Sequence, residues 1–486
     1  MNGFLTRPAQ PGSSSELLRI AVPLVISSGT LSLMQVLDRM FLMWYSTDAL
    51  AAAMPSGLLH WSLMSIAIGT AGYVNTFVAQ YEGAGRPDRV AGSMWQGIYF
   101  CIFAAAFMLL FLPCTEGIFR LVGHEKVVQD LECTYFRIMC VGTAPFLLSA
   151  VLSCFYSGRG RTMTIMWVNL GSTVVNAALN YWLVFGGWGV PALGIAGAGW
   201  ATVLASCLGV LTFVILLLRS EDARPYHLLK HYRFDRELFV RLLRYGLPSG
   251  VHFFVDVACF SAFILLIGST GKMQLAATNL AFNVNSLLFL PMLGFGTAVM
   301  TLVGKRIGEG HPAMAIRTTW IAFGFTTIYM SVWASILVFV PDIVLAPYAA
   351  RSNPAEFAAI EPMVTILLQF VAAYTLFDGM NIVFASAIRG AGDTRFCLLF
   401  SFFSSLLLMV IPSYVALRVF DMGLYAAWAC VMVYVVFLSF GFLLRFLAGH
   451  WQSMSVIHEA PAAVAATQPQ WDLAAPDADP VSVIAN

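Results

Sequence analysis

Charged residues are scarce in this sequence. Asp, Glu, Lys and Arg make up only 10% of its 486 residues, whereas soluble globular domains carry about 25%. Hydrophobic residues make up 59%, and the mean hydropathy is +0.80. This composition excludes an ordinary soluble protein and indicates one large membrane protein. The net charge of +1 gives no reason to expect a nucleic acid as a partner.

Motifs for catalysis, metals and secretion are also missing. The nine cysteines form no CxxC pair, so neither a zinc site nor a disulfide framework is indicated. The segment 304–306 (GKR) lacks the rest of a phosphate-binding loop, and 124–128 (HEKVV) lacks the second His of a zinc-protease helix. No signal-peptide pattern precedes the first apolar run. We therefore expect neither an enzyme nor a resident cofactor.

Long apolar runs, by contrast, recur along the whole chain. Each is long enough to cross a hydrocarbon core of roughly 30 Å, and inside a bilayer such runs form helices because the backbone must satisfy its own hydrogen bonds. The predicted spans are 17–43, 52–79, 92–113, 131–156, 163–185, 194–218, 243–268, 276–303, 317–340, 360–388, 397–418 and 423–447.

The basic residues predict the orientation of these spans. Of the 26 Lys and Arg residues, 19 fall on one side of the membrane, 13 of them in the loops around residues 86–89, 159–161, 219–244 and 389–395. The opposite loops hold few: Arg120, Lys126, Lys272, Arg351 and Arg418. Because basic loops stay in the cytoplasm, we expect both termini there, in a protein of the cytoplasmic (inner) membrane.

The second half of the chain repeats the first. At an offset of 225 residues Gly83, Gly85 and Pro87 fall on Gly308, Gly310 and Pro312, and at an offset of 232 the GRGRT of 158–162 meets the GAGDT of 390–394. Each copy contains six predicted spans, and six is even, so both copies enter the membrane from the same side. Parallel repeats related by an axis along the membrane normal are typical of transporters.

The repeat predicts the fold and its domains. We expect an all-α polytopic membrane protein with 12 transmembrane helices, arranged as two parallel six-helix lobes. The expected parts are a cytoplasmic N-terminal segment (1–15), an N-lobe (16–218), a cytoplasmic connector (219–241), a C-lobe (242–447) and a flexible cytoplasmic tail (448–486).

Three acids fall well inside predicted spans: Asp38, Asp256 and Asp378. Counted at 1.5 Å per residue from Arg244 and Arg389, Asp256 lies roughly 18 Å and Asp378 roughly 16 Å above the cytoplasmic face. Two helices thus place carboxylates at about the same depth. Charged residues inside membrane spans usually face a polar interior and serve ion or substrate pathways.

Asp38 belongs to a second group of polar residues. It precedes the interfacial pair Trp44 and Tyr45 and lies roughly 9 Å below the outer surface. Asn176, Asn180 and Thr202 reach the same outer part of the N-lobe, and Gln35 lies one helical turn from Asp38.

The acids do not follow the repeat, because Asp38 corresponds to Phe263, Asp256 to Leu31 and Asp378 to Phe146. A purely structural requirement would tend to be symmetric. The alternative is that the acids form satisfied buried hydrogen bonds or ion pairs, with Arg39 and Arg137 as partners. His252 lies one turn before Asp256 on the same helical face and is either a functional residue or a hydrogen-bonded core residue.

Several motifs resemble those of multidrug and toxic compound extrusion (MATE) transporters. The loops VAQYEGAGRPD (78–88) and LVGKRIGEGHP (302–312) resemble the loops after the second and eighth helices of that family. MQVLDRM (34–40), LPSGVHFFVD (247–256) and DGMNIVFASAIRGAGDT (378–394) are similar to its first, seventh and tenth helices. Asn180, where another branch has an Asp, favours the norfloxacin-exporter (NorM-like) branch.

The resemblance implies an antiporter that exports organic, often cationic and amphipathic compounds in exchange for Na⁺ or H⁺. It implies cation coupling by Asp38, Asn176, Asn180, Thr202, Asp256 and Asp378. Substrate contacts are expected from Gln35, His252, Asp256 and Asp378, and Na⁺ binding from the three acids. The expected partners are small organic cations or amphipathic drugs and the lipid bilayer, and we expect a monomer. The alternatives are a flippase of a lipid-linked precursor, which would need a cationic cavity, and an intramembrane enzyme.

Overall fold

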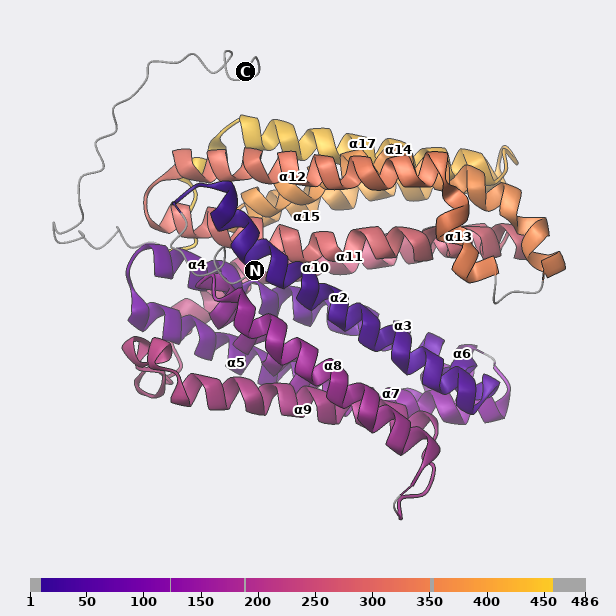
Figure 1. Ribbon diagram of the computed structural model, residues 1–486, viewed down its shortest axis with the longest axis horizontal. Coiled ribbons are helices and arrows are strands. Elements are labelled where there is room, and N and C mark those ends of the chain that lie inside the picture. Colours follow the sequence, from indigo (N-terminus) through magenta and orange to yellow (C-terminus); the bar gives the residue numbers. More distant parts are fainter. Residues whose placement is uncertain (1–9, 123, 188, 350–353, 458–486) are drawn as a thin grey trace.

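The chain is almost entirely helical (Figure 1). The computed structural model describes residues 10–122, 124–187, 189–349 and 354–457. Within these ranges there is no β-strand, and the only β-type pairing is an isolated bridge between Gly187 and Val190. The long helices lie side by side and run along the longest axis of the molecule (Figure 1). The expected all-α fold class is confirmed.

The described residues of the first half of the chain form eight α-helices, two of which, α4 and α6, are short. They are α2 (Ser14–Tyr45), α3 (Thr47–Gly72), α4 (Val74–Gly83), α5 (Pro87–Leu109), α6 (Thr115–Val122), α7 (Lys126–Gly158), α8 (Thr162–Phe185) and α9 (Ile195–Arg219). The connector that follows contains two short 3₁₀-helices, η1 (Glu221–Tyr226) and η2 (Leu228–Lys230).

The second half repeats this order. It contains α10 (Arg236–Gly268), α11 (Lys272–Gly308), α12 (Pro312–Phe339), α13 (Pro341–Ala349), α14 (Pro354–Ala391), α15 (Thr394–Ser404), a π-helix η3 (Ser405–Val410), α16 (Ile411–Arg418), α17 (Leu424–Leu447) and a short η4 (His450–Ser453). The segment α15–η3–α16 fills the single span predicted over 397–418.

Eleven helical segments of the described residues are long and apolar enough to cross a membrane. A helix occupies each of the twelve predicted spans, but α8, in the place of 163–185, is not among the eleven. The amide side chains of Asn169, Asn176 and Asn180 lower the mean hydropathy of α8. All three make hydrogen bonds inside the lobe. The expected count of twelve membrane helices is therefore not confirmed by composition.

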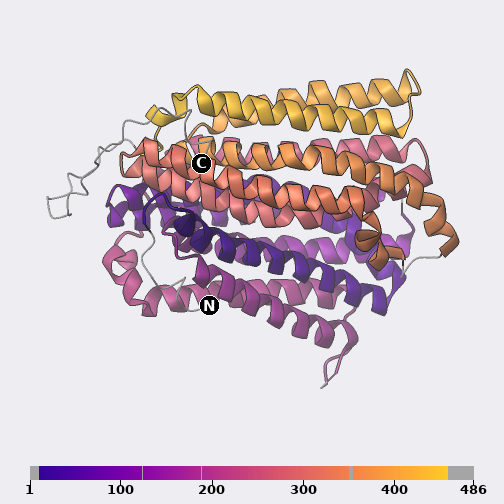
Figure 2. The same ribbon diagram turned by 45° about the horizontal axis from the view of Figure 1, so that its top comes forward.

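The two halves form two lobes with matching internal contacts (Figures 1 and 2). In the N-lobe α2 packs on α8, α3 on α7 and α7 on α9; in the C-lobe α10 packs on α15, α11 on α14 and α14 on α17. Between the lobes α2 packs on α11 and α3 on α10. Each contact has a counterpart in the other half, as expected for parallel repeats.

The repeated Gly and Pro residues shape two equivalent turns. Gly85 and Gly310 have φ angles of 67° and 76°, a left-handed conformation that glycine adopts without steric strain. Pro87 and Pro312 then begin α5 and α12, where the missing N–H of proline costs no helical hydrogen bond. The repeat was visible in the sequence because both turns need these residues.

Residues 448–457, the first part of the flexible tail expected for 448–486, are packed against the rest of the protein. Trp451, Val456 and Ile457 are buried, and the Trp451 ring stacks on Phe446 with 4.9 Å between ring centroids. The packed chain therefore continues to residue 457, because its apolar side chains find a site beside α14 and α17. The rest of the predicted tail (458–486), the predicted loop residue Arg351 and most of the predicted N-terminal segment lie outside the described residues.

Large apolar side chains cover much of the outer surface. Phe339 is 80% exposed and Leu265 76% exposed. Many further Leu, Ile, Val and Phe side chains on most of the long helices are more than a third exposed. Soluble monomers rarely expose contiguous apolar surface of this extent. The surface is that of a protein surrounded by lipid.

Candidate functional site

A cluster of hydrogen-bonded polar side chains surrounds Asp38 in the N-lobe. Asn180 on α8 donates to Asp38 Oδ1 at 2.6 Å, and Thr202 on α9 donates to Asp38 Oδ2 at 3.2 Å. Asn176 donates to the Thr202 hydroxyl at 3.3 Å, and its own Oδ1 accepts from Asn180 at 3.2 Å. The four residues predicted as one N-lobe group therefore do lie together, contributed by α2, α8 and α9.

The neighbours of Asp38 on α2 lie outside this cluster. Gln35 and Arg39 are exposed, and Arg39 forms no ion pair with a described residue, although its charge acts on Asp38. Arg137, the other basic residue considered as a partner, pairs with Glu116 at 2.8 Å instead. Neither arginine neutralises an intramembrane acid by direct contact.

Asp256 and His252 occupy one face of α10 in the C-lobe. His252 Nδ1 lies 3.6 Å from Asp256 Oδ2, and its Nε2 makes a hydrogen bond of 2.8 Å with the hydroxyl of Ser401 on α15. His252 is buried, whereas the Asp256 side chain remains 34% exposed. One turn further along α10, Cys259 contacts the hydroxyl of Ser405 at 3.3 Å, where the π-helix begins.

Asp378 lies on α14 of the same lobe. It is half-buried, and Asn381 donates to its Oδ1 at 3.5 Å. Asp378 and Arg389 are the charged groups that act on Asp256, and both acids act on the Tyr434 hydroxyl. No hydrogen bond joins the two acids in the described part of the chain, and their equal depth stays a prediction.

Several residues of these clusters were not predicted from the sequence: Ser401, Ser405, Asn381 and Tyr434. Hydroxyls and amides are common in membrane helices, so their type alone marks nothing. Asn381 had a local signal, because it follows Asp378 at a spacing of three residues on one helical face. The others come from distant helices, and only the packing of α10 against α15 and η3 brings the serines to this site.

The N-lobe cluster retains an oxygen atom without a partner. Asn180 Oδ1 is buried and accepts no hydrogen bond within the described chain. Together with the Asp38 carboxylate and the Thr202 hydroxyl, it presents oxygen ligands of the kind that hard cations prefer. The described residues contain no group of three or more His, Cys, Asp or Glu side chains that would hold a metal ion.

Hydrogen bonds between the two lobes gather at one end of the bundle. This end carries the arginines of the loops 86–89, 159–161 and 389–395 and is called the arginine-rich end below. Asn75 on α4 donates to the Thr301 hydroxyl on α11 at 2.9 Å, and it accepts from Ser157 within its own lobe at 2.6 Å. Tyr73 donates to the Arg389 carbonyl oxygen at 2.8 Å. Two buried N-lobe side chains, Asn75 and Tyr73, thus bond to the C-lobe at this junction.

Charged and glycine contacts reinforce the junction. Arg306 on α11 is 3% exposed and forms ion pairs at 2.5 Å with Glu16 on α2 and Glu309. Gly83 and Gly308 pack so closely that a Cβ atom on either would overlap the backbone of the opposite lobe. The backbones of α4 and α11 meet because both glycines lack a side chain.

Gln80 on α4 connects the N-lobe to both the C-lobe and the segment after α17. Its Nε2 donates to the Gly390 carbonyl oxygen at 2.9 Å. Its Oε1 accepts from the Ser455 hydroxyl at 2.8 Å and from the Val456 amide at 3.0 Å. Gln80 is completely buried. The segment after α17 is therefore part of the lobe junction.

Known proteins resemble this chain over most of its length. A probable multidrug resistance protein NorM of Thermotoga maritima is 26% identical over 464 residues, which cover 93% of this chain and 96% of that protein. A multidrug resistance protein NorM of Burkholderia vietnamiensis is 28% identical over 399 residues, or 81% and 86% of the two chains.

The fold also has a counterpart among solved structures. One described as the outward-facing conformation of a multidrug resistance MATE family transporter of the MOP superfamily superimposes with a TM-score of 0.83. It is 18% identical and covers 94% of this chain and 99% of its own. In addition, residues 23–182 and 248–415 match the MatE family model, one segment in each lobe. Since these segments cover well over half of the sequence, the protein belongs to the MatE family.

Proposed function

We propose that the protein is a secondary active antiporter that exports organic, often cationic and amphipathic compounds in exchange for Na⁺ or H⁺. Family membership and the names of its relatives, which are multidrug resistance proteins, support this function. The observation that carries the proposal is a hydrogen-bonded carboxylate within the long apolar helices of each lobe, Asp38 in one and Asp256 in the other. An acid at this depth costs on the order of 2.5–3.5 kcal/mol, and such acids typically mark ion pathways.

The two clusters would have different roles in ion and substrate binding. Asp38, with Asn176, Asn180 and Thr202, offers oxygen ligands for a cation in the N-lobe. In the C-lobe Asp256 and Asp378 would take up H⁺ or Na⁺ and attract a cationic substrate. His252 in the C-lobe and Gln35 on α2 in the N-lobe would be further substrate contacts. The coupling ion is transported cargo in this proposal, and no resident cofactor is needed.

Transport would proceed by rocking of the two lobes. The hydrogen bonds of the junction close the arginine-rich end, while Asp256 remains about one third exposed. This state would admit ions from the opposite end. Opening of the arginine-rich end would break the contacts of Gln80, Asn75 and Arg306, and a bound ion or substrate must compensate for their loss.

We propose that the arginine-rich end faces the cytoplasm in the inner membrane, since basic loops remain on that side. The beginning of α2 and the end of α17 lie at this end of the bundle, with α6 and α13 at the other (Figure 1). Both termini would then be cytoplasmic. We propose a monomer, because each lobe already completes its cluster from its own helices.

The driving force fits such an exchange. One monovalent cation that moves through 100 mV releases about 2.3 kcal/mol. At about 1.4 kcal/mol per factor of ten, this sustains a gradient of roughly forty-fold for a neutral substrate. One-for-one exchange of a monovalent cationic drug is electrically neutral, so only the concentration gradient of the ion drives it.

The test is export of a fluorescent cationic dye from membrane vesicles under imposed Na⁺ or pH gradients. Asp38→Asn, Asp256→Asn and Asp378→Asn should each reduce gradient-driven export at least tenfold, whereas Asp48→Asn at an exposed position should not. Undiminished export in all three variants would exclude these acids as coupling groups. A flippase would require cations at the deep sites, and an intramembrane enzyme would require a nucleophile with a base; the deep ionisable residues here are mainly acids, so we propose neither.

A further inference from the structure

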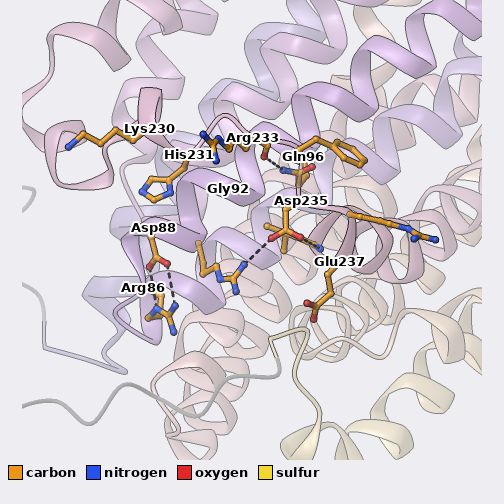
Figure 3. A pocket seen from close by; sticks show the side chains of 13 residues that line it. Arg86, Asp88, Gly92, Gln96, Lys230, His231, Arg233, Asp235 and Glu237 are labelled. Carbon is orange, nitrogen blue, oxygen red and sulfur yellow. Dashed lines mark hydrogen bonds and ion pairs between the residues drawn. The ribbon is translucent and has the colours of Figure 1, made fainter.

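A basic hollow lies outside both carboxylate clusters, at the arginine-rich end of the bundle (Figure 3). Its volume is about 570 Å³, and it opens between the first turns of α5 and the segment that leads from η2 into α10. Five Lys and Arg residues and three carboxylates line it. Neither the coupling ion nor the substrate pathway accounts for this site.

The three carboxylates of the hollow are already paired. Asp88 binds Arg86 through both of its oxygens at 3.2 Å, and Asp235 binds Arg89 at 3.0 Å (Figure 3). The third carboxylate, Glu237, forms an ion pair with an arginine one turn further along α10. These acids therefore do not neutralise the remaining cations.

Lys230, Arg233 and Arg236 are those remaining cations. All three are exposed, and no ion pair or side-chain hydrogen bond to them occurs in the described part of the chain. They come from seven consecutive residues that fold around one side of the hollow. Three such positive charges around one hollow attract an anionic group such as a phosphate.

The segment that carries these cations is held rigidly against α5. The Trp95 indole donates to the Leu228 carbonyl oxygen at 2.8 Å, and Gln96 donates to the Arg233 carbonyl oxygen at 3.3 Å. The Tyr99 hydroxyl donates to a further carbonyl oxygen of the segment. The hollow is thus a preformed feature, because three side chains of α5 fix the backbone of its basic wall.

Exposed aromatic rings continue from the hollow along α5. Phe234, 52% exposed, contacts Tyr99 and Phe239 with ring centroids 5.7 and 5.1 Å apart. Phe239 in turn contacts Phe103, which is 64% exposed, at 6.2 Å. Tyr99, Phe103 and Phe107 follow one face of α5 at four-residue intervals, away from the basic end and into the apolar part of the bundle surface.

We propose that this hollow binds the phosphate headgroup of an anionic phospholipid, with the acyl chains against the aromatic face of α5. Basic pockets beside membrane helices recognise anionic headgroups in this way. A free phosphate ester would use the three cations but would leave the aromatic face uncovered, and therefore the structure favours a lipid. The inference is independent of ion coupling; it uses the proposed orientation only to assign the lipid to the cytoplasmic leaflet.

The position of the hollow gives the lipid a role in the access cycle. Its wall combines α5 of the N-lobe with the segment that enters α10 of the C-lobe, and α5 and α10 are in contact. A headgroup bound by both parts stabilises the arrangement in which the arginine-rich end is closed. Depletion of anionic lipid should accordingly favour opening of that end.

Native mass spectrometry of the purified full-length protein tests the proposal. The protein is equilibrated with mixed micelles of phosphatidylglycerol and phosphatidylcholine, and the retained lipids are counted. The wild type should retain phosphatidylglycerol preferentially, and the triple variant Lys230→Gln, Arg233→Gln, Arg236→Gln should lose at least about tenfold in affinity for it. A matched triple variant with Lys126→Gln, Lys272→Gln and Arg418→Gln, all exposed at the opposite end, removes the same charge and should bind as the wild type does.

Two further measurements distinguish a lipid from a soluble anion. Phe103→Ala with Phe234→Ser should weaken retention of phosphatidylglycerol, and glycerol phosphate at equal concentration should not displace the lipid. Equal retention by the wild type and the basic triple variant would overturn the proposal, provided that circular dichroism shows both folded. Displacement by glycerol phosphate, or no effect of the aromatic substitutions, would overturn the assignment to a lipid.

Discussion

Gln80→Met should destabilise both the contact between the lobes and the packing of residues 455–457. Methionine fills a similar volume but offers neither the strong donor nor the strong acceptor of the amide. The change removes the hydrogen bond to the Gly390 carbonyl oxygen at 2.9 Å and those from Ser455 and Val456 at 2.8 and 3.0 Å. Because Gln80 and Val456 are fully buried, water cannot replace the lost partners without opening the packed segment.

The size of the effect follows from the groups left behind. A buried polar group without a partner costs about 1–3 kcal/mol, and the Val456 amide is one such group. At about 1.4 kcal/mol per factor of ten, its opening equilibrium should rise between roughly five-fold and a hundred-fold. The Gly390 carbonyl oxygen adds a similar cost on the C-lobe side, so the closed junction becomes less stable as well.

Hydrogen–deuterium exchange measures this directly, because the Val456 amide is itself the donor. A peptide that ends at Ile457 should exchange faster in Gln80→Met than in the wild type. Gln452→Met provides the control, since it makes the same substitution at an exposed position of the same segment. Identical exchange of Val456 in the wild type and Gln80→Met would refute the role assigned to Gln80.

Three more predictions concern the same end of the molecule. Arg306→Met should cost about 1–3 kcal/mol and lower the thermal unfolding temperature, because it leaves the partly buried carboxylate of Glu16 without its cation. Gly308→Ala should also lower it, since the added methyl group overlaps the backbone of α4 and pushes the lobes apart. Burial and the hydrogen bond to Glu82 raise the pKa of Tyr226 to about 12. The stability that this group contributes is complete below about pH 10 and is lost as the pH rises through 12, so Tyr226→Phe should flatten that part of an alkaline unfolding curve.

Matched variants separate these effects from general damage. Arg86→Met breaks a half-exposed ion pair and should cost less than about 1 kcal/mol. Gly72→Ala adds its methyl group where no atom lies within 4 Å and should leave unfolding unchanged. A similar loss in each control and its test variant would contradict the packing arguments, and alkaline curves that coincide with and without the Tyr226 hydroxyl would contradict the pKa argument.

The helices and the acids were predictable from the sequence for physical reasons. A membrane helix must be apolar over its whole length, so the spans were visible without any knowledge of packing. The same rule made Asp38, Asp256 and Asp378 conspicuous, and the helical rise per residue gave their expected depths. The hydrogen bond between Asp38 and Asn180 shows that the predicted N-lobe group lies together. The equal depth of Asp256 and Asp378 stays a prediction.

The remaining features depend on contacts that no local pattern encodes. The composition of residues 448–457 is unremarkable, and Trp451 and Val456 are buried only because α17 delivers them to a site prepared by the lobe junction. The π-helix at Ser405 and the hydrogen bond of Ser401 to His252 likewise arise from packing of α15 on α10. The basic hollow was visible only as a charge excess, because its pairing pattern needs the folded connector.

The hydrogen bond between Gln80 and Ser455 also sets an order for biosynthesis. The two residues are 375 positions apart, and at typical synthesis rates of about 5–20 residues per second roughly twenty seconds to more than a minute separates them. During that interval the Gln80 amide has no partner from the chain end. Junction contacts such as that between Asn75 and Thr301 can form earlier. The contacts of Gln80 with Ser455 and Val456 can form only after these residues have been synthesised, so a chain truncated before them would have a weaker junction.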